Sequence, residues 1–182
     1  MRVYCDTDTL LHNIERHADQ PRVQAELDAL RFLLKQHADG HIIMFRSRVN
    51  LRELEQTTNV DQLWRLSADY EALEPVPLDE RYYGNTQEMT DLYGSVISSP
   101  LVSDVQDEKI LAELQSYGLK RRDAEHITQA VCNDCHVFLT RDRNSIVKFR
   151  RRIEARFAKL RVLRPSELVT ELNSALKVAD QY

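Results

Sequence analysis

The chain has 182 residues, of which 42% are hydrophobic and 30% are charged, so it is long enough to bury the core of one domain. With four glycines, five prolines and no run near about eighteen consecutive apolar residues, the composition excludes collagen-like, low-complexity and membrane-spanning chains. The net charge of -4 at pH 7 gives no general support for binding nucleic acid, which would have to come from local clusters of basic residues.

The three cysteines are too few and too unevenly placed to form the disulfide framework of a secreted domain, so we expect a reducing compartment. The opening segment has two acids by residue 8 and no long apolar stretch, and we therefore expect no signal peptide and a cytoplasmic location. Cys132 to His136 spells CxxCH, a pattern of haem attachment that also contains a zinc or redox CxxC. Because Cys135 continues the apolar face of the preceding predicted helix, we interpret it as a buried thiol.

Strands and helices alternate in the first part of the chain. Residues 2–5 predict a strand that stops at a cluster of Asp and Thr residues. Residues 21–38 predict a helix, with proline in its first turn and a glycine just beyond its end. The run HIIMF at 41–45 predicts a buried strand, and 48–56 is a helix-friendly segment.

The second part of the chain repeats this alternation after an irregular insertion. A helix is predicted from about residue 60 to 73, whereas 74–100 holds three of the five prolines and two of the four glycines. The remaining predicted elements are helices at 110–117 and 123–133, a strand at 137–140, a helix at 143–157, a strand at 160–163 and a helix at 165–176. We therefore predict a single three-layer α/β/α domain over 1–182, with a central parallel sheet and an irregular helical insertion around 59–100.

Several acids follow or flank these strands. Asp6 directly follows the first strand, and two residues separate Asp142 from the VFL run at 137–139, so both carboxylates are expected at the carboxyl edge of a parallel sheet. Asp123 begins the helix that leads into the second of these strands, and Glu53 lies on the helix after HIIMF. Crowded carboxylates need an offsetting cation, and oxygen ligands favour Mg²⁺ or Mn²⁺. This pattern predicts phosphodiester hydrolysis by a metal-activated water.

Four segments resemble those of the PIN domain, a metal-dependent nuclease family that includes the VapC-type toxins. VYCDTDTLL at 3–11 is similar to the first motif and NLREL at 50–54 to the second. DAEHITQAVCNDCHVFLTRDRNSI at 123–146 resembles the segment that bears the third and fourth acids, and KLRVLRPSEL at 159–168 resembles the closing strand and helix start.

The resemblance implies a Mg²⁺- or Mn²⁺-dependent endoribonuclease in which Asp6, Glu53, Asp123 and Asp142 are catalytic and hold the metal. It further implies an RNA substrate, an antitoxin protein as partner if the chain is a toxin, and a homodimer. Because the sequence has no long apolar run, we expect no membrane partner. One alternative is a catalytically weak PIN-like module that binds RNA or protein. A more distant one is a haloacid-dehalogenase-like phosphatase, because DTDTL at 6–10 half-matches DxDx[TV].

Some assignments within the predicted site stay open. Asp8 stands where family members often have Asn, and it either joins the metal ligands or caps the following helix. Glu55 is close enough in sequence to take the place of Glu53. Thr140 and Asn144, which flank Asp142, either orient the residues of the site or have structural roles in a turn or helix cap. The histidines, His126 among them, are interpreted as packing or surface groups.

A basic run begins beside the fourth acid. Between residues 141 and 164 there are ten basic residues and two acids, a net charge of +8 for the segment. Such a run is often only the solvated face of a helix. Because this one would flank the predicted site, we expect it to contact the RNA backbone through Arg141, Arg143, Arg150, Arg151 and Arg152.

Overall fold

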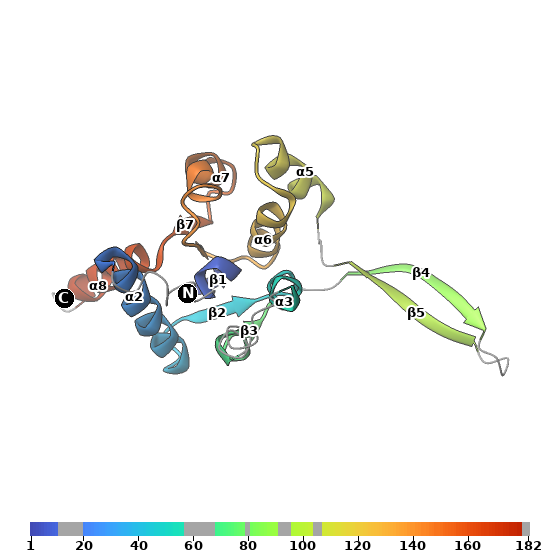
Figure 1. Cartoon of the computed structure of the whole chain (residues 1–182), viewed down its shortest axis with the longest axis horizontal. Coiled ribbons are helices and arrows are strands. Elements are labelled where there is room, and N and C mark those ends of the chain that lie inside the picture. Colours follow the sequence, from blue (N-terminus) through green and yellow to red (C-terminus); the bar gives the residue numbers. More distant parts are fainter. Residues whose placement is uncertain (11–19, 57–67, 79–80, 91–95, 104–106, 180–182) are drawn as a thin grey trace.

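The computed structural model describes residues 1–10, 20–56, 68–78, 81–90, 96–103 and 107–179, with 81–90, 96–103 and 175–179 described as backbone only. Within these residues the chain forms a five-stranded sheet and a separate two-stranded sheet. Helices pack on the larger sheet, and the smaller one extends away from it (Figure 1). No helix in these ranges is long and apolar enough to cross a membrane.

The five-stranded sheet is parallel throughout. Its members are β1 (Arg2–Cys5), β2 (Ile43–Arg46), β3 (Glu74–Pro75), β6 (Val137–Leu139) and β7 (Arg161–Leu163), in the order β3-β2-β1-β6-β7. Because β2 and β6 lie on opposite sides of β1, the strand order reverses there. The carboxyl ends of β1 and β6 therefore border the crevice in which open α/β sheets bind their ligands.

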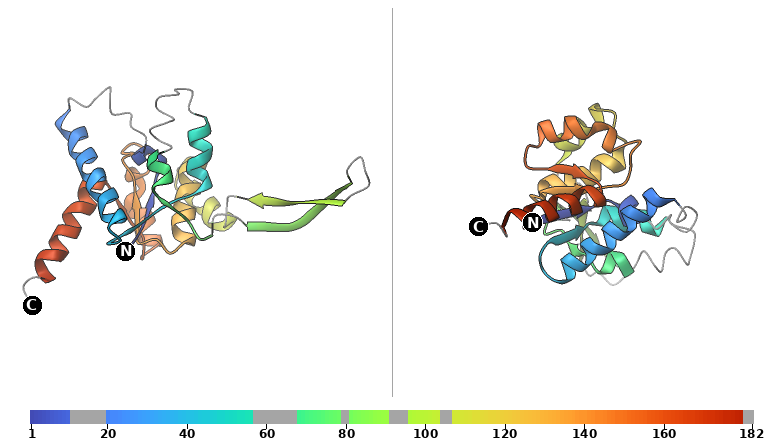
Figure 2. Two further views of the ribbon diagram at one scale, coloured as in Figure 1. Left: turned by 90° about the horizontal axis from the view of Figure 1, so that it is seen from below. Right: turned by 90° about the vertical axis from the view of Figure 1, so that its left-hand side faces the viewer.

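Helices cover both faces of this sheet (Figure 2). The helices on one face are α5 (Glu108–Ser116), α6 (Arg121–Cys132) and α7 (Arg150–Arg156), the last preceded by the 3₁₀ turn η1 (Val147–Phe149). The helices on the other face are α2 (Pro21–Ala38), α3 (Arg48–Glu55) and α8 (Pro165–Ala179). The short α1 (Thr7–Leu10) follows β1. The predicted three-layer α/β/α architecture with a central parallel sheet is confirmed.

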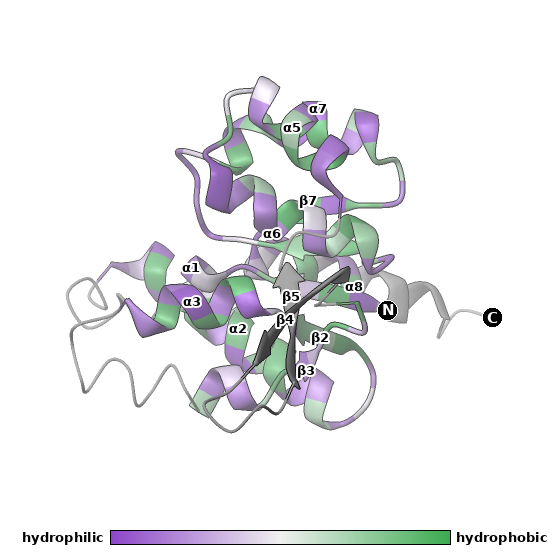
Figure 3. Ribbon diagram, turned by 90° about the vertical axis from the view of Figure 1, so that its right-hand side faces the viewer, coloured by the Kyte–Doolittle hydropathy of each residue, from purple (hydrophilic) through white to green (hydrophobic). Residues whose placement is uncertain are grey.

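Alternation along the strands divides the core into two clusters. Tyr4 and Phe138 face the cluster under α5, α6 and α7, whereas Val3 and Leu139 face the cluster under α2, α3 and α8. Along the helices, hydrophilic and hydrophobic stretches alternate, as expected for elements with one face on the sheet and one in solvent (Figure 3). Cys135 is buried in the first cluster, in agreement with its interpretation as a packed thiol.

The insertion differs from the sequence-based expectation. Instead of irregular helical structure, the chain forms an antiparallel hairpin of β4 (Arg81–Thr90) and β5 (Val96–Ser103), which projects from the domain (Figures 1 and 2). Aromatic and β-branched residues in both strands favour extended backbone and outweigh the turn-forming residues of this segment. The pairing register shifts between Tyr83 and Gln87. Of the helix predicted over 60–73, residues 68–71 are helical and 72–73 are not, while 60–67 lie outside the described residues.

Candidate active site

Five carboxylates line one pocket of about 320 Å³ at the carboxyl end of the sheet. They come from Asp6 after β1, Asp8 in α1, Glu53 in α3, Asp123 in α6 and Asp142 in the loop after β6, and Gln56 and Arg122 complete the lining. The four acids predicted from the sequence are thus brought together, and Asp8 joins them. Of the two glutamates left open, Glu53 lines the pocket, whereas Glu55 is exposed and does not.

The ends of β1 and β6 hold the first of these acids in place. The Asp6 amide donates to the Leu139 carbonyl oxygen (3.0 Å), which continues the pairing of the two strands by one residue. Thr140 Oγ1 donates to Asp6 Oδ2 (2.7 Å) and accepts from the Asp142 amide (3.0 Å). Thr140 therefore links the acid after β1 to the loop after β6.

The loop after β6 is organised by its own aspartate. Asp142 Oδ1 accepts the amides of Asn144 and Ser145, each at 2.9 Å, and the Ser145 hydroxyl donates to Asp123 Oδ2. Residues 143–146 form turns, so the helix predicted over 143–157 is wrong at its start. The Asp142 carboxylate satisfies backbone donors that a helix would have used, and the resulting turn connects the third and fourth acids. Asn144 contributes its backbone amide to this turn.

His126, in α6, lies next to two of these acids and is almost fully buried, at 1% exposure. Its Nε2–H donates to Glu53 Oε2 (3.1 Å) and lies 3.8 Å from Asp6 Oδ1, while Nδ1 is hydrogen-bonded to the Tyr4 hydroxyl (2.8 Å). Its burial agrees with the interpretation of the histidines as packing or surface groups, and its hydrogen bond to Glu53 also ties it to the acidic pocket. The sequence signal is its position three residues after Asp123, which places both side chains on one face of the helix.

A buried network of hydroxyl and amide side chains is hydrogen-bonded to His126 through Tyr4 and Thr7. The Tyr4 hydroxyl also contacts Ser47 Oγ (2.6 Å), and Asn50 Nδ2 donates to Thr7 Oγ1 (3.0 Å). Ser47 and Asn50 form a capping box at the start of α3, in which Asn50 Oδ1 accepts the Ser47 amide (2.8 Å). This box fixes the first turn of the helix that carries Glu53 one turn further on.

Burial and crowding perturb the titration of the site. Burial raises the pKa of Asp6 to about 6, against the charge of His126 and the hydrogen bond from Thr140. Burial also favours the protonated form of Glu53, but the hydrogen bond and charge of His126, together with Thr7 and Arg122, outweigh it and lower the pKa of Glu53. For His126, burial lowers the pKa, yet the hydrogen bond to Glu53 and the charge of Asp6 raise it above its ordinary value. Desolvation raises the pKa of Asp8.

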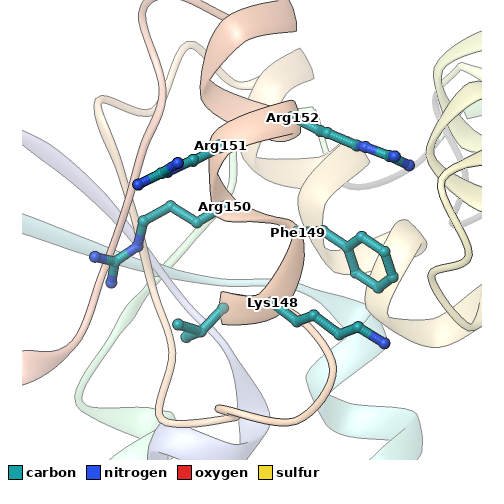
Figure 4. Close-up of a pocket in the computed structure, with 6 residues that line it drawn as sticks. Lys148, Phe149, Arg150, Arg151 and Arg152 are labelled. Carbon is teal, nitrogen blue, oxygen red and sulfur yellow. The ribbon is translucent and has the colours of Figure 1, made fainter.

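The basic run is divided between two surfaces. Arg150 forms a two-pronged ion pair with Glu167 (2.6 and 3.3 Å), and this pair holds the pKa of Glu167 at about 2 against the opposing effect of its burial. Around α7, Arg150 and Arg151 point to one side and Arg152 to the other (Figure 4). Arg141 and Arg143 lie apart from these residues, next to the acidic pocket. The run is therefore not one continuous face.

The sequence matches no family model and no curated protein. Among solved structures, the crystal structure of VapBC2 from Rickettsia felis bound to a DNA fragment from their promoter is similar, with a TM-score of 0.50 and 15% identity. The match covers 90% of this chain and 98% of that chain. The fold is PIN-like.

The acidic pocket of this PIN-like domain has the chemistry of a site for a hard divalent cation. Its walls hold five carboxylates against one arginine, and the raised pKa of Asp6 reflects the cost of keeping a buried carboxylate charged. In the described part of the chain, no three His, Cys, Asp or Glu side chains are grouped tightly enough to form a ready-made metal centre. Mg²⁺ is usually held by one or two carboxylates and several waters, so the donors present fit it.

Proposed function

We propose that the protein is a Mg²⁺- or Mn²⁺-dependent endoribonuclease that hydrolyses RNA phosphodiester bonds. The observation that carries this proposal is the convergence of five carboxylates from four separate segments on one pocket, at the point where the strand order reverses. The choice of RNA over other phosphodiesters follows from the resemblance of the sequence motifs to PIN-domain nucleases.

In this proposal Asp6, Glu53, Asp123 and Asp142 would form the metal site, with one or two of them on the ion and the others reaching it through water, and with Asp8 beside them. When bound, the ion offsets the carboxylate charge, lowers the pKa of an attacking water and neutralises charge that develops on the phosphate. Thr140 and Ser145 fix the acids on which this depends.

The charges of two pocket residues suit this proposal. Glu53, whose pKa is lowered, is ionised at neutral pH, which is the form in which a carboxylate would hold the metal. Arg122 also lines the pocket, where its guanidinium can contact non-bridging phosphate oxygens, and Gln56 Oε1 orients it by accepting from its Nη2 (2.6 Å).

The partners belong to the same proposal. The structural likeness to VapBC2 is consistent with an antitoxin partner that would cover the acidic pocket. A homodimer and a cytoplasmic location are further parts of the proposal, drawn from the resemblance and from the cysteine usage.

The test is cleavage of labelled RNA by the full chain with Mn²⁺ or with a chelator. Glu53→Gln and Glu55→Gln form a matched pair, because the residues are two positions apart on one helix and only Glu53 lines the pocket. Glu53→Gln and Asp6→Asn should lower cleavage by more than the roughly 10–100-fold that changes around metal ligands cost, and Glu55→Gln should not lower it. Binding of RNA with no cleavage of any RNA in Mn²⁺ would favour the alternative of a binding module.

A further inference from the structure

A second pocket, of opposite charge, adjoins the acidic one. It has a volume of about 230 Å³ and is lined by Gln20, Arg22, Val23, Glu26, Arg141, Arg143 and Arg164. A neighbouring pocket shares four of these residues and adds the start of α8. Four arginines from three separate segments thus surround one carboxylate, and we call this surface the arginine pocket.

The carboxylate that lines the arginine pocket is already engaged. Glu26 accepts from the amide and hydroxyl of Ser166 (3.0 and 2.8 Å), so it caps α8, and Arg164 Nη1 lies 3.5 Å from it. Arg164 is also paired with Glu167 (3.0 Å). The negative charge of Glu26 is therefore balanced by Arg164 and by the positive end of the α8 dipole.

The other arginines of the pocket lack such partners. Arg22 and Arg143 are exposed, and neither forms an ion pair or a side-chain hydrogen bond with the described part of the chain. Arg141 is half-buried, and its charge acts on the Asp8 carboxylate of the acidic pocket. Guanidinium groups that outnumber the carboxylates of one concave surface attract an anion.

The two pockets share a wall. Asp142 lines the acidic pocket, and its chain neighbours Arg141 and Arg143 line the arginine pocket. The loop 141–143 therefore separates a cluster of carboxylates from a cluster of guanidiniums. A phosphodiester strand that crosses this loop would therefore pass from the carboxylates to the guanidiniums.

We propose that the arginine pocket binds a phosphate of the RNA strand next to the phosphate that is cleaved, so that the strand crosses the loop 141–143. The inference rests on the proposed function, because it takes the strand in the acidic pocket to be RNA. Guanidinium groups bind phosphate through paired N–H donors, and Arg22 and Arg143 approach from different segments. The site is independent of base sequence, since it contacts only the backbone.

The experiment is binding of a fluorescently labelled single-stranded RNA, measured by anisotropy in the presence of a chelator and in an Asp6→Asn background. The double variant Arg22→Ala/Arg143→Ala removes the two exposed arginines. Arg31→Ala is the matched control, because Arg31 is exposed on the same helix as Arg22 but lies outside the pocket and pairs with Asp28. Thermal melts check that all variants are folded.

The double variant should bind at least about fivefold more weakly than the Arg31→Ala control. The slope of log affinity against log salt should also become shallower by about 0.7 for each phosphate that the variant no longer binds. Affinity and slope equal to those of Arg31→Ala would overturn the proposal.

Failure of this inference can be told apart from failure of the proposed function. If the otherwise unmutated chain cleaves RNA but the double variant binds it as tightly as the control, the nuclease proposal stands and the arginine pocket is not its phosphate site. If no RNA is cleaved in Mn²⁺ and the double variant still binds more weakly with the reduced salt slope, the phosphate site stands and the nuclease proposal fails.

Discussion

Replacement of Asp6 by asparagine should stabilise the protein at neutral pH in metal-free buffer. Burial raises the pKa of Asp6 to about 6 from the value of 3.8 in an unfolded chain, so the fold favours the protonated, neutral side chain. The stability contributed by the bound proton is fully present below pH 3.8 and is lost as the pH rises through 6. Asparagine has the shape of the neutral acid at every pH and can keep the hydrogen bond with Thr140.

The size of the effect follows from the shift in pKa. A displacement of about two units corresponds to at most about 3 kcal/mol in the free energy of unfolding, at about 1.4 kcal/mol per unit. For a domain of this size, 1 kcal/mol moves the Tm by roughly 2–4 °C. The Tm of Asp6→Asn should therefore exceed that of the unmutated chain by up to about 6–12 °C at pH 7.5, and the difference should disappear near pH 4.

The assay is a series of thermal melts in chelator from pH 4 to pH 7.5, with the two Tm values subtracted at each pH. Other groups titrate in both proteins, so the difference isolates Asp6. Asp28→Asn, at an exposed position on α2, is the control and should show a Tm difference independent of pH. If Asp6→Asn is no more stable than the unmutated chain at pH 7.5, or if the difference does not change with pH, the account of a strained buried carboxylate is wrong.

Two further variants test the surroundings of the pocket. His126→Gln should slow single-turnover RNA cleavage by roughly 10–100-fold, because Glu53 loses the hydrogen bond that orients it; an unchanged rate would show that His126 only packs. Arg151→Ala combined with Arg152→Ala tests the part of the basic run on α7, where the sequence-based expectation is weaker RNA binding and a smaller salt slope, measured by anisotropy. An unchanged salt dependence would exclude that part of the run from the RNA path.

The positions of Asp6 and Asp142 were predictable because they depend on strand direction alone. A parallel sheet places the residues that follow β1 and β6 at one edge, whatever packs around them. The choice between Glu53 and Glu55 was not predictable to the same degree. It depends on which face of α3 turns toward the sheet, and the capping box at Ser47 and Asn50 sets that orientation through side-chain contacts.

The contacts of His126 and the β4–β5 hairpin could not be predicted from the sequence. His126 is hydrogen-bonded to Tyr4 and to Glu53, which lie 122 and 73 residues away in the sequence. No local pattern contains such contacts. The hairpin of β4 and β5 was not predicted because prolines and glycines dominate the local sequence pattern, although the residues beside them favour strands. The single-domain organisation over 1–182 stays a prediction.

The basic run shows a different limit. Ten basic residues between 141 and 164 look like one feature in the sequence. In the fold, Arg150 is paired with Glu167, whereas Arg141 and Arg143 join Arg22 from a helix more than a hundred residues earlier. Charge density along the chain therefore does not show which of its basic residues share one surface.

The most direct test of the acidic pocket is a calorimetric titration of the purified chain with Mn²⁺, compared with Asp6→Asn, Asp142→Asn and Glu55→Gln. The unmutated chain and Glu55→Gln should bind Mn²⁺ saturably and with equal affinity. The two aspartate variants should bind at least about tenfold more weakly. Absence of Mn²⁺ binding by the unmutated chain, or equal binding by all four proteins, would contradict the claim that these carboxylates form a metal site.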